Sequence, residues 1–355
     1  MKKIVSIVGA RPQFVKLSPL SKILSQYVEE IVIHTGQHYD ENMSKVFFDE
    51  LGIKKPDYNL EVGSRKHGVQ TAEMMFKLEE ILEKEEPDLC IIFGDTNSTL
   101  AGALVASKLG ITTLHIEAGL RSFNRSMPEE INRIVADHLS DHLFAPNQIS
   151  YDNLLKEGLH EKSVITGDIM VDSVLDNSSE ASAKSLILDE LGIVSSDYYL
   201  VTLHRPYNVD NIPRLKNIFI ELSKLNKNIV FPVHPRTRKI ISDSDLKISN
   251  RILLTDPVGY FDFLKLMQNS YKIITDSGGI QKEAYILKKP CITLRHETEW
   301  TETVTSGWNL LIDLNEDQFF ADKIINFIPP NENKPLFGDN VSEKMLKEIL
   351  AILNK

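Results

Sequence analysis

The sequence contains little of what marks a secreted or membrane protein. Only two of its 355 residues are cysteines, Cys90 and Cys291. Both fall inside expected strands, which is typical of small core residues in a reducing cytoplasm. No apolar run approaches the roughly 20 residues that a membrane-spanning helix needs. The apolar run at residues 4–8 is too short for a signal peptide. We therefore expect a cytoplasmic protein without a membrane partner.

The chain also lacks an excess of positive charge. Its formal net charge is -10, which argues against a general attraction to nucleic acid or to an anionic membrane. An anionic ligand would need a local basic pocket. No Gly-x-Gly-x-x-Gly, Walker loop or serine nucleophile elbow occurs. The sequence therefore carries no signal for NAD, ATP or serine-hydrolase chemistry.

Short apolar runs alternate with helical periodicity along the whole chain. Nearly continuous apolar strands in such an alternation predict an α/β fold whose parallel sheets are covered on both faces. The expected strands cover residues 4–8, 30–34, 89–93, 113–117, 143–145, 199–203, 229–232, 252–254, 272–275, 291–294 and 310–314.

The length of 355 residues is comfortable for two domains. Between Asp172 and Asp197 the composition becomes rich in Ser, Asp and Ala, which indicates a helical connection. We expect domains at residues 1–172 and 173–341, each with a doubly wound sheet. The expected helix at 342–355 fits either domain. A ligand cleft is expected between the domains, at the carboxyl ends of the strands.

The most informative turn runs from Asp276 to Gly279, between an expected strand and an expected helix. Gly278 and Gly279 allow a ligand to approach the backbone closely. The helix start offers free N–H groups and a partial positive charge. Ser277 can cap this helix, and Glu283 lies one to two turns in, within reach of ribose hydroxyls. These features suit a nucleotide diphosphate, although Gly-Gly is also an ordinary tight turn.

Charged side chains follow the expected strands of the first half. Arg11 and Lys16 lie near a helix start, where cations oppose the helix dipole. Binding an anion would explain them, and a solvated surface role is the alternative. Asp95 reads most simply as a helix N-cap. Glu129 lies in the first turn of an expected helix, where acidic residues are common for dipole reasons alone.

Glu117 follows four apolar-compatible positions at a strand tip. Partial burial there would raise its pKa and suit it to general acid or base work. The alternative is a glutamate paired with Arg121 or Arg125. The two interpretations carry equal weight.

Histidines and arginines follow strands of the second half. His204 and Arg205 follow one expected strand and Arg295 follows another. An imidazole at a strand tip can bind phosphate or move protons. His138 and His142 have the spacing of a helical metal pair, but the zinc-peptidase glutamate is missing and a strand follows. We therefore expect no metal there.

A set of short motifs occurs in one unbroken order from residue 4 to about residue 314. Each motif alone is weak, but the ordered set resembles the non-hydrolysing UDP-N-acetylglucosamine 2-epimerase family. The motifs are Gly9-Ala10-Arg11-Pro12, Thr35-Gly36-Gln37-His38, Gly94-Asp95-Thr96, Glu117-Ala118-Gly119-Leu120-Arg121, Pro128-Glu129-Glu130-x-Asn132-Arg133, His204-Arg205, His234-Pro235 and Asp276-Ser277-Gly278-Gly279.

The resemblance implies a glycosyltransferase-B-type architecture of two Rossmann-like domains with an interdomain cleft, usually as a homodimer. It implies reversible conversion of UDP-GlcNAc to UDP-ManNAc for surface polysaccharide, such as capsule, with no metal or nicotinamide cofactor. In this family UDP leaves C1 anti to the C2 proton, giving 2-acetamidoglucal, and then adds back. An alternative is a glycosyltransferase of the same fold, which would need an acceptor site.

The resemblance also assigns roles residue by residue. Asp95, Glu117 and Glu129 resemble the acid/base carboxylates, and His204 the histidine that meets the diphosphate. The residues that resemble substrate-binding positions are Arg11, Lys16, Phe263, Ser277, Gly278, Gly279 and Glu283.

Two segments depart from the common family pattern. The loop at residues 122–127 carries an extra Arg125, and Trp300 stands where Arg is common. Both look like the branch that includes UDP-2,3-diacetamido-glucuronate epimerases, where Arg125 would pair with a C6 carboxylate. The alternatives are that Arg125 is a surface residue or that it aids UDP-GlcNAc binding. Further sugar or regulatory contacts are expected at Gln37, His38, Arg125, Arg205 and Arg295.

Overall fold

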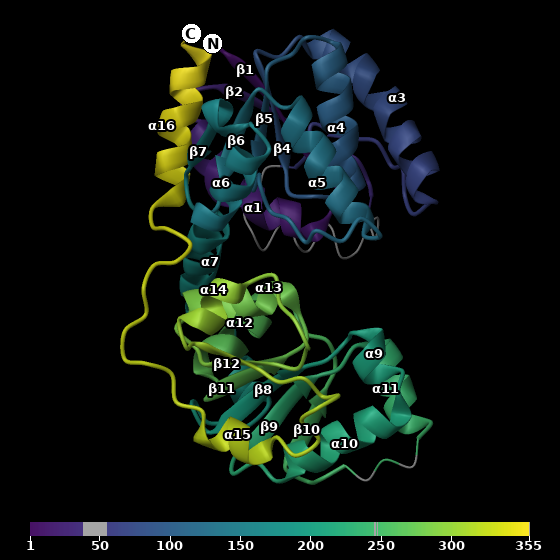
Figure 1. Ribbon diagram of the computed structural model, residues 1–355, viewed down its shortest axis with the longest axis vertical. Helices are drawn as coiled ribbons and strands as arrows, with labels where there is room; N and C mark the ends of the chain where they lie inside the picture. The colour runs from purple at the N-terminus through teal and green to yellow at the C-terminus, as the bar shows by residue number, and fades with distance from the viewer. Residues whose placement is uncertain (38–54, 245, 247, 355) are drawn as a thin grey trace. The chain divides into compact units, whose positions relative to one another are not determined.

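The computed structural model describes residues 1–37, 55–244, 246 and 248–354. The chain divides into two compact units, coloured along the sequence in Figure 1. The first unit contains Met1–Ser173 and Phe337–Lys355, and the second contains Val174–Leu336. None of the described helices combines the length and hydropathy that a membrane span requires.

The first unit is a parallel sheet with helices packed around it. Among the described residues the strand order is β3-β2-β1-β4-β5-β6-β7. The strands are β1 (Lys3–Val8), β2 (Glu29–His34), β3 (Tyr58–Asn59), β4 (Leu89–Phe93), β5 (Thr113–Ile116), β6 (His142–Ala145) and β7 (Ser163–Ile165). The helices are α1 (Arg11–Leu24), α3 (His67–Glu85), α4 (Asn97–Lys108), α5 (Pro128–Leu139), α6 (Gln148–Lys156), the 3-10 turn η1 (His160–Lys162), the first turns of α7 (Met170–Lys184) and α16 (Val341–Leu353).

The second unit repeats this plan. Its described strands have the order β10-β9-β8-β11-β12-β13 and are also parallel. They are β8 (Tyr198–Thr202), β9 (Asn228–Pro232), β10 (Ile252–Thr255), β11 (Lys272–Thr275), β12 (Cys291–Thr293) and β13 (Asn309–Leu311). The helices that begin in this unit are α8 (Ile187–Glu190), α9 (Pro206–Val209), α10 (Ile212–Ser223), α11 (Pro235–Ser242), α12 (Tyr260–Asn269), α13 (Gly278–Ile286), α14 (Thr301–Thr305) and α15 (Ala321–Asn326).

Burial on both faces explains why the strands read as continuous apolar runs. Every residue of β4 is fully buried, as a central strand covered by helices requires. Cys90 lies in β4 and Cys291 in β12; both are buried and free, and burial raises the pKa of each thiol to about 12. They are core residues, as the sequence indicates. The two short strands β3 and β7 were not expected, because neither forms a buried apolar run.

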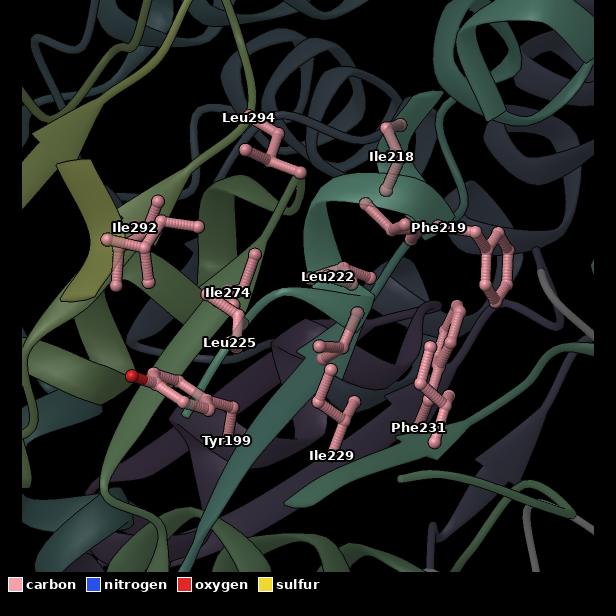
Figure 2. Close-up of a cluster of buried hydrophobic side chains, with 14 of the residues drawn as sticks. Tyr199, Ile218, Phe219, Leu222, Leu225, Ile229, Phe231, Ile274, Ile292 and Leu294 are labelled. Atoms are coloured by element: carbon pink, nitrogen blue, oxygen red, sulfur yellow. The ribbon is translucent and has the colours of Figure 1, made fainter. Parts of the chain in front are cut away.

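The core of the second unit lies between its sheet and α10. Figure 2 shows Ile218, Phe219 and Leu222 of α10 close to the side chains of the strands. The strand residues of this cluster include Tyr199, Ile229, Phe231, Ile274 and Ile292. All of them are at most 2% exposed. This packing fixes the strands whose ends carry the predicted site residues.

Helix α16 belongs to the first unit, where it packs against α1. Asp172 caps it. The carboxylate of Asp172 accepts hydrogen bonds from the backbone N–H of Val341 at 3.2 Å and of Ser342 at 2.7 Å. The chain therefore returns to its first unit after completing the second.

Each sheet has one point at which the order of its strands along the sequence reverses. In the first sheet β1 and β4 are neighbours. The strand that follows β1 in the sequence, β2, lies on one side of this pair, and the strand that follows β4, β5, lies on the other. In the second sheet β8 and β11 have the same relation. Open α/β sheets bind ligands beyond the carboxyl ends of the strands at such points. Arg11 and Asp95 follow β1 and β4, and His204 and Ser277 follow β8 and β11.

Candidate active site

A buried glutamine, Gln13, connects the turn after β1 to the end of β4. Gln13 of α1 accepts a hydrogen bond from the Gly9 N–H at 2.7 Å. Its amide donates to the Phe93 carbonyl at 2.7 Å. Gln13 therefore ties the end of β1 to the end of β4, across the reversal point of the sheet.

Glu117 lies directly after β5 in a left-handed conformation, with φ of 71°. The expected strand is one residue too long, because this conformation ends the ladder. The Glu117 carboxylate forms an ion pair with the Lys16 ammonium of α1, and both side chains are 9% exposed. A solvated surface role for Lys16 is therefore wrong. The predicted alternative partner Arg121 instead binds Asp137 and Glu157.

Asp95 lies in the turn after β4 and is not the N-cap of the next helix. Thr96 occupies the N-cap of α4, so the simplest interpretation of Asp95 was wrong. The Asp95 carboxylate pairs with Arg133 of α5 at 2.5 Å and is 31% exposed. Its backbone carbonyl accepts a hydrogen bond from Asn132 at 2.9 Å. Helix α5 thus fixes both the backbone and the side chain of Asp95.

Glu129 and Glu130 lie side by side in the first turn of α5 but differ in environment. Glu129 is half-buried, and no hydrogen bond or ion pair to it is found within the described part of the chain. Glu130 is buried and accepts hydrogen bonds from the N–H groups of Ser122 and Phe123, both at 2.9 Å. Burial raises the pKa of Glu130, but these bonds and Arg133 outweigh it, so the pKa lies below its usual value. Glu130 anchors the loop, a role that sequence reasoning missed.

In the second unit, Asp276 organises the turns after β8 and β11. Its buried carboxylate accepts hydrogen bonds from the N–H groups of His204 and Arg205 and from the Asn208 amide. The His204 ring nitrogen Nδ1 lies 3.1 Å from it. Burial raises the pKa of Asp276, but these partners lower it further than burial raises it. The His204 side chain stays half exposed and is oriented by Asp276, a residue of the predicted turn to which no separate role was assigned.

The Gly-Gly turn forms the first turn of α13, as predicted. Ser277 occupies the N-cap, but its side chain makes no capping hydrogen bond. A Cβ added to Gly278 would lie 2.3 Å from the Glu299 carboxylate, whereas one added to Gly279 would meet nothing within 4 Å. Glu299 pairs with Arg295 at 2.9 Å. The start of α13 therefore lies beside the Arg295–Glu299 ion pair, and the N-terminus of a helix favours anions.

The other residues of the second unit that were predicted to bind substrate lie on its helices. Glu283 is half-buried on α13, and Phe263 is half-buried on α12. Trp300 packs under Lys282, whose ammonium lies 4.2 Å from the ring centroid. This cation–π contact gives a structural reason for tryptophan at position 300.

The remaining predicted residues are dispersed. Gln37 accepts hydrogen bonds from the Ser98 N–H at 3.0 Å and hydroxyl at 2.7 Å, at the start of α4. Arg125 is exposed on the loop before α5. Arg205 is the N-cap of α9. His38 and the side chain of Arg11 lie outside the described residues.

His138 and His142 lie in different elements. Helix α5 ends at Leu139, and His142 begins β6. The two side chains therefore do not share one helical face.

Comparison with known proteins places this geometry in context. A family model described as UDP-N-acetylglucosamine 2-epimerase matches residues 22–351. The UDP-N-acetylglucosamine 2-epimerase of Methanocaldococcus jannaschii is 45% identical over 98% of this chain and 99% of its own length. The UDP-2,3-diacetamido-2,3-dideoxy-D-glucuronate 2-epimerase of Pseudomonas aeruginosa is 47% identical over 99% of this chain and 100% of its own length.

Solved structures agree with the fold. The M. jannaschii UDP-GlcNAc 2-epimerase in complex with UDP-GlcNAc and UDP superposes with a TM-score of 0.84, covering 99% of both chains at 45% identity. The Neisseria meningitidis UDP-GlcNAc 2-epimerase bound to UDP-GlcNAc gives 0.86, with 98% of this chain and 100% of that chain covered at 30% identity. The expected fold class, two Rossmann-like units on parallel sheets, is confirmed.

Proposed function

The chain belongs to the UDP-N-acetylglucosamine 2-epimerase family, and from this premise we propose that it interconverts UDP-GlcNAc and UDP-ManNAc without hydrolysing them. A base removes the C2 proton while the C1–O bond breaks and UDP leaves with the electron pair. The products are 2-acetamidoglucal and UDP. UDP then adds back to C1 as a proton returns to the opposite face of C2.

The observation that carries this proposal is the nearly buried Glu117 carboxylate, which follows β5 and pairs with Lys16 of α1. A carboxylate beside a lysine in a place of restricted solvent access suits proton transfer at a carbon. Asp95, in the turn after β4, and Glu129, in the first turn of α5, supply further carboxylates.

The second unit supplies what the leaving group needs. Negative charge develops on the diphosphate as the C1–O bond breaks, and oriented N–H groups and cations stabilise it. The start of α13, Arg295 and the Asp276-held His204 offer such groups. In this proposal Glu283 binds the ribose and Phe263 lies beside the uracil.

The decisive test is incubation with UDP-GlcNAc in deuterated water, followed by NMR. We expect deuterium at C2 and a growing UDP-ManNAc signal. Glu117→Gln should slow the exchange at least ~100-fold, while Glu180→Gln on the exposed face of α7 should not. Release of one UDP per turnover would point to a hydrolysing enzyme. Binding without C2 exchange would leave a transferase of the same fold.

A second candidate substrate is the diacetamido-uronic sugar nucleotide. Two observations favour it. The chain is 47% identical to the Pseudomonas aeruginosa enzyme and 45% identical to the M. jannaschii enzyme. Arg125 is exposed on the loop that Glu130 anchors. Substrate competition separates the two candidates. If the uronic sugar is the substrate, Arg125→Gln should raise its KM and leave that of UDP-GlcNAc unchanged.

We also propose that the enzyme works in the cytoplasm as a homodimer and supplies a precursor of surface polysaccharide. Absence of a resident cofactor is part of the proposal, since the elimination requires only proton transfer and charge stabilisation. Analytical ultracentrifugation tests the dimer. Activity that survives exhaustive chelation tests the metal-free mechanism.

A further inference from the structure

We propose that His115 and Asp137 form a buried positioning pair that fixes the turns carrying Asp95 and Glu117. The inference rests on the proposed epimerase function. Neither residue is needed to touch substrate in this account. Both act through the backbone of the carboxylate-bearing turns.

His115 is fully buried on β5, and both of its ring nitrogens face acceptors. Nε2 lies 2.7 Å from the Gly94 carbonyl oxygen, and Nδ1 lies 2.7 Å from the Asp137 carboxylate. A carbonyl oxygen only accepts, so Nε2 carries a hydrogen. A second proton must lie between Nδ1 and Asp137. His115 thus bridges the turn after β4 to helix α5.

Asp137 is fully buried on α5 and serves as the hub. Besides His115, its carboxylate accepts from the Gly119 N–H at 3.1 Å and pairs with Arg121 at 2.7 Å. Arg121 in turn pairs with Glu157 at 2.7 Å. The His115 and Arg121 partners outweigh burial and keep the pKa of Asp137 below its usual value. The Asp137 side chain therefore contacts residues on both sides of Glu117 in the sequence.

These contacts of Asp137 explain how Glu117 keeps its unusual backbone conformation. A non-glycine residue at φ of 71° persists only where the surroundings determine it. Its neighbours at positions 115 and 119 are both bonded to Asp137. A Cβ on Gly94 would lie 3.3 Å from both the Glu117 carboxylate and the Lys16 ammonium. Movement of the Gly94 turn would therefore disturb Asp95 and the Lys16–Glu117 pair together.

A purely structural role is the competing account, and paired variants of His115 separate the two. In His115→Asn the amide replaces Nδ1 and keeps a donor toward Asp137 but loses the one toward Gly94. In His115→Gln the amide reaches toward the Nε2 position and keeps the donor toward Gly94. We expect His115→Asn to lower kcat for C2 exchange 10- to 100-fold, and His115→Gln to recover most of that loss. KM and the Kd for UDP should stay within twofold.

The control is a buried polar contact of the second unit. Lys272 donates to the carbonyl oxygens of Ile324 and Phe327, both at 2.6 Å. Lys272→Met should lower thermal stability and leave kcat unchanged, so that stability loss by itself does not mimic the effect. Wild-type kcat in a folded His115→Asn variant would overturn the positioning role. So would equal losses in kcat for both His115 variants.

Two readouts keep this inference separate from the proposed function. Ring ¹⁵N NMR of the wild-type protein should show a protonated His115 Nε2 whether or not epimerisation occurs, and an unprotonated Nε2 would overturn the inference. If the wild-type protein catalyses no C2 exchange on either candidate sugar, the proposed function is overturned instead. If His115→Asn does not fold, Asp137→Asn, which keeps the side-chain shape, takes its place with the same expected loss in kcat.

Discussion

At the scale of single residues, two glycines of the first unit share a conformation but not surroundings. Gly94 and Gly110 have φ of 64° and 69°, but an added Cβ approaches Glu117 and Lys16 only at Gly94. Alanine at either position should cost about 1–2 kcal/mol of unfolding free energy, because of the left-handed backbone. We expect Gly94→Ala also to lower kcat at least tenfold.

Gly110→Ala is the matched control, since nothing lies within 4 Å of its added Cβ. Urea unfolding and the C2 exchange rate, measured on both variants, check the prediction. Equal kcat values for the two would mean that the Gly94 turn does not control the carboxylate site.

His34 makes stability depend on pH. Burial against Phe14 lowers the pKa of His34 from 6.5 to about 4. The folded state then binds fewer protons than the unfolded state between these values, so stability is complete above pH 6.5 and falls as the pH drops toward 4. The loss from this group amounts to about 3 kcal/mol. Denaturation curves from pH 7 to 4 measure it.

The control for this prediction is His34→Asn, which can still accept the Gly36 N–H that His34 Nδ1 accepts at 2.8 Å. Its stability should change less with pH across the same window. Parallel pH dependences for the two proteins would assign the loss to other groups.

At the scale of elements, the start of α13 can be tested apart from its fold. Gly279 and Gly68 are each the second residue of a helix, and an added Cβ meets nothing at either. Alanine should therefore leave the stability of both unliganded variants unchanged or up to about 1 kcal/mol higher. We expect Gly279→Ala to weaken UDP binding at least tenfold, because the methyl group would occupy space needed by the diphosphate.

Isothermal titration with UDP checks this, with Gly68→Ala as the matched variant of α3. Unchanged affinity in Gly279→Ala would remove the diphosphate from this helix start. Weakened affinity in both variants would indicate a global effect.

The sequence predicted elements well where the signal was local. Buried strands such as β4 form continuous apolar runs, and the Gly-Gly turn begins α13 as expected. The prediction of the N-cap of α4 failed because two adjacent residues can both cap a helix. Asp95 and Thr96 are both good capping residues, and only tertiary pairing with Arg133 decides between them.

The partners of the site could not be predicted, because they are far apart in the chain. Lys16 and Glu117 are separated by 101 residues, and Asp276 and His204 by 72. No periodicity or spacing rule reports such pairs. The resemblance predicted the acid/base residues. The supporting roles of Asp137 and Glu130 could be recognised only from the packing of the folded chain.

At the scale of the whole molecule, the first unit depends on a segment that follows the second. Ending the chain after Leu336 would remove Phe337, Val341, Met345, Ile349 and Leu353, all buried. Loss of this apolar burial should cost at least about 5 kcal/mol, enough to unfold a unit of ordinary stability. The second unit should still fold and bind UDP.

Circular dichroism and UDP titration on the shortened chain measure both effects. Asp172→Asn is the graded control, because it weakens only the cap of α16 and should cost about 1 kcal/mol. An unchanged first transition in the shortened chain would show that α16 is dispensable.

The return of the chain also sets an order of events during synthesis. Domains usually fold as they leave the ribosome, the amino-terminal one first. Here α1 packs against α16, which is translated more than 300 residues later. The apolar face of α1 therefore stays uncovered until α16 has been made. The second unit can complete its core before the first does. A nascent chain stalled just short of α16 would present that uncovered face to chaperones.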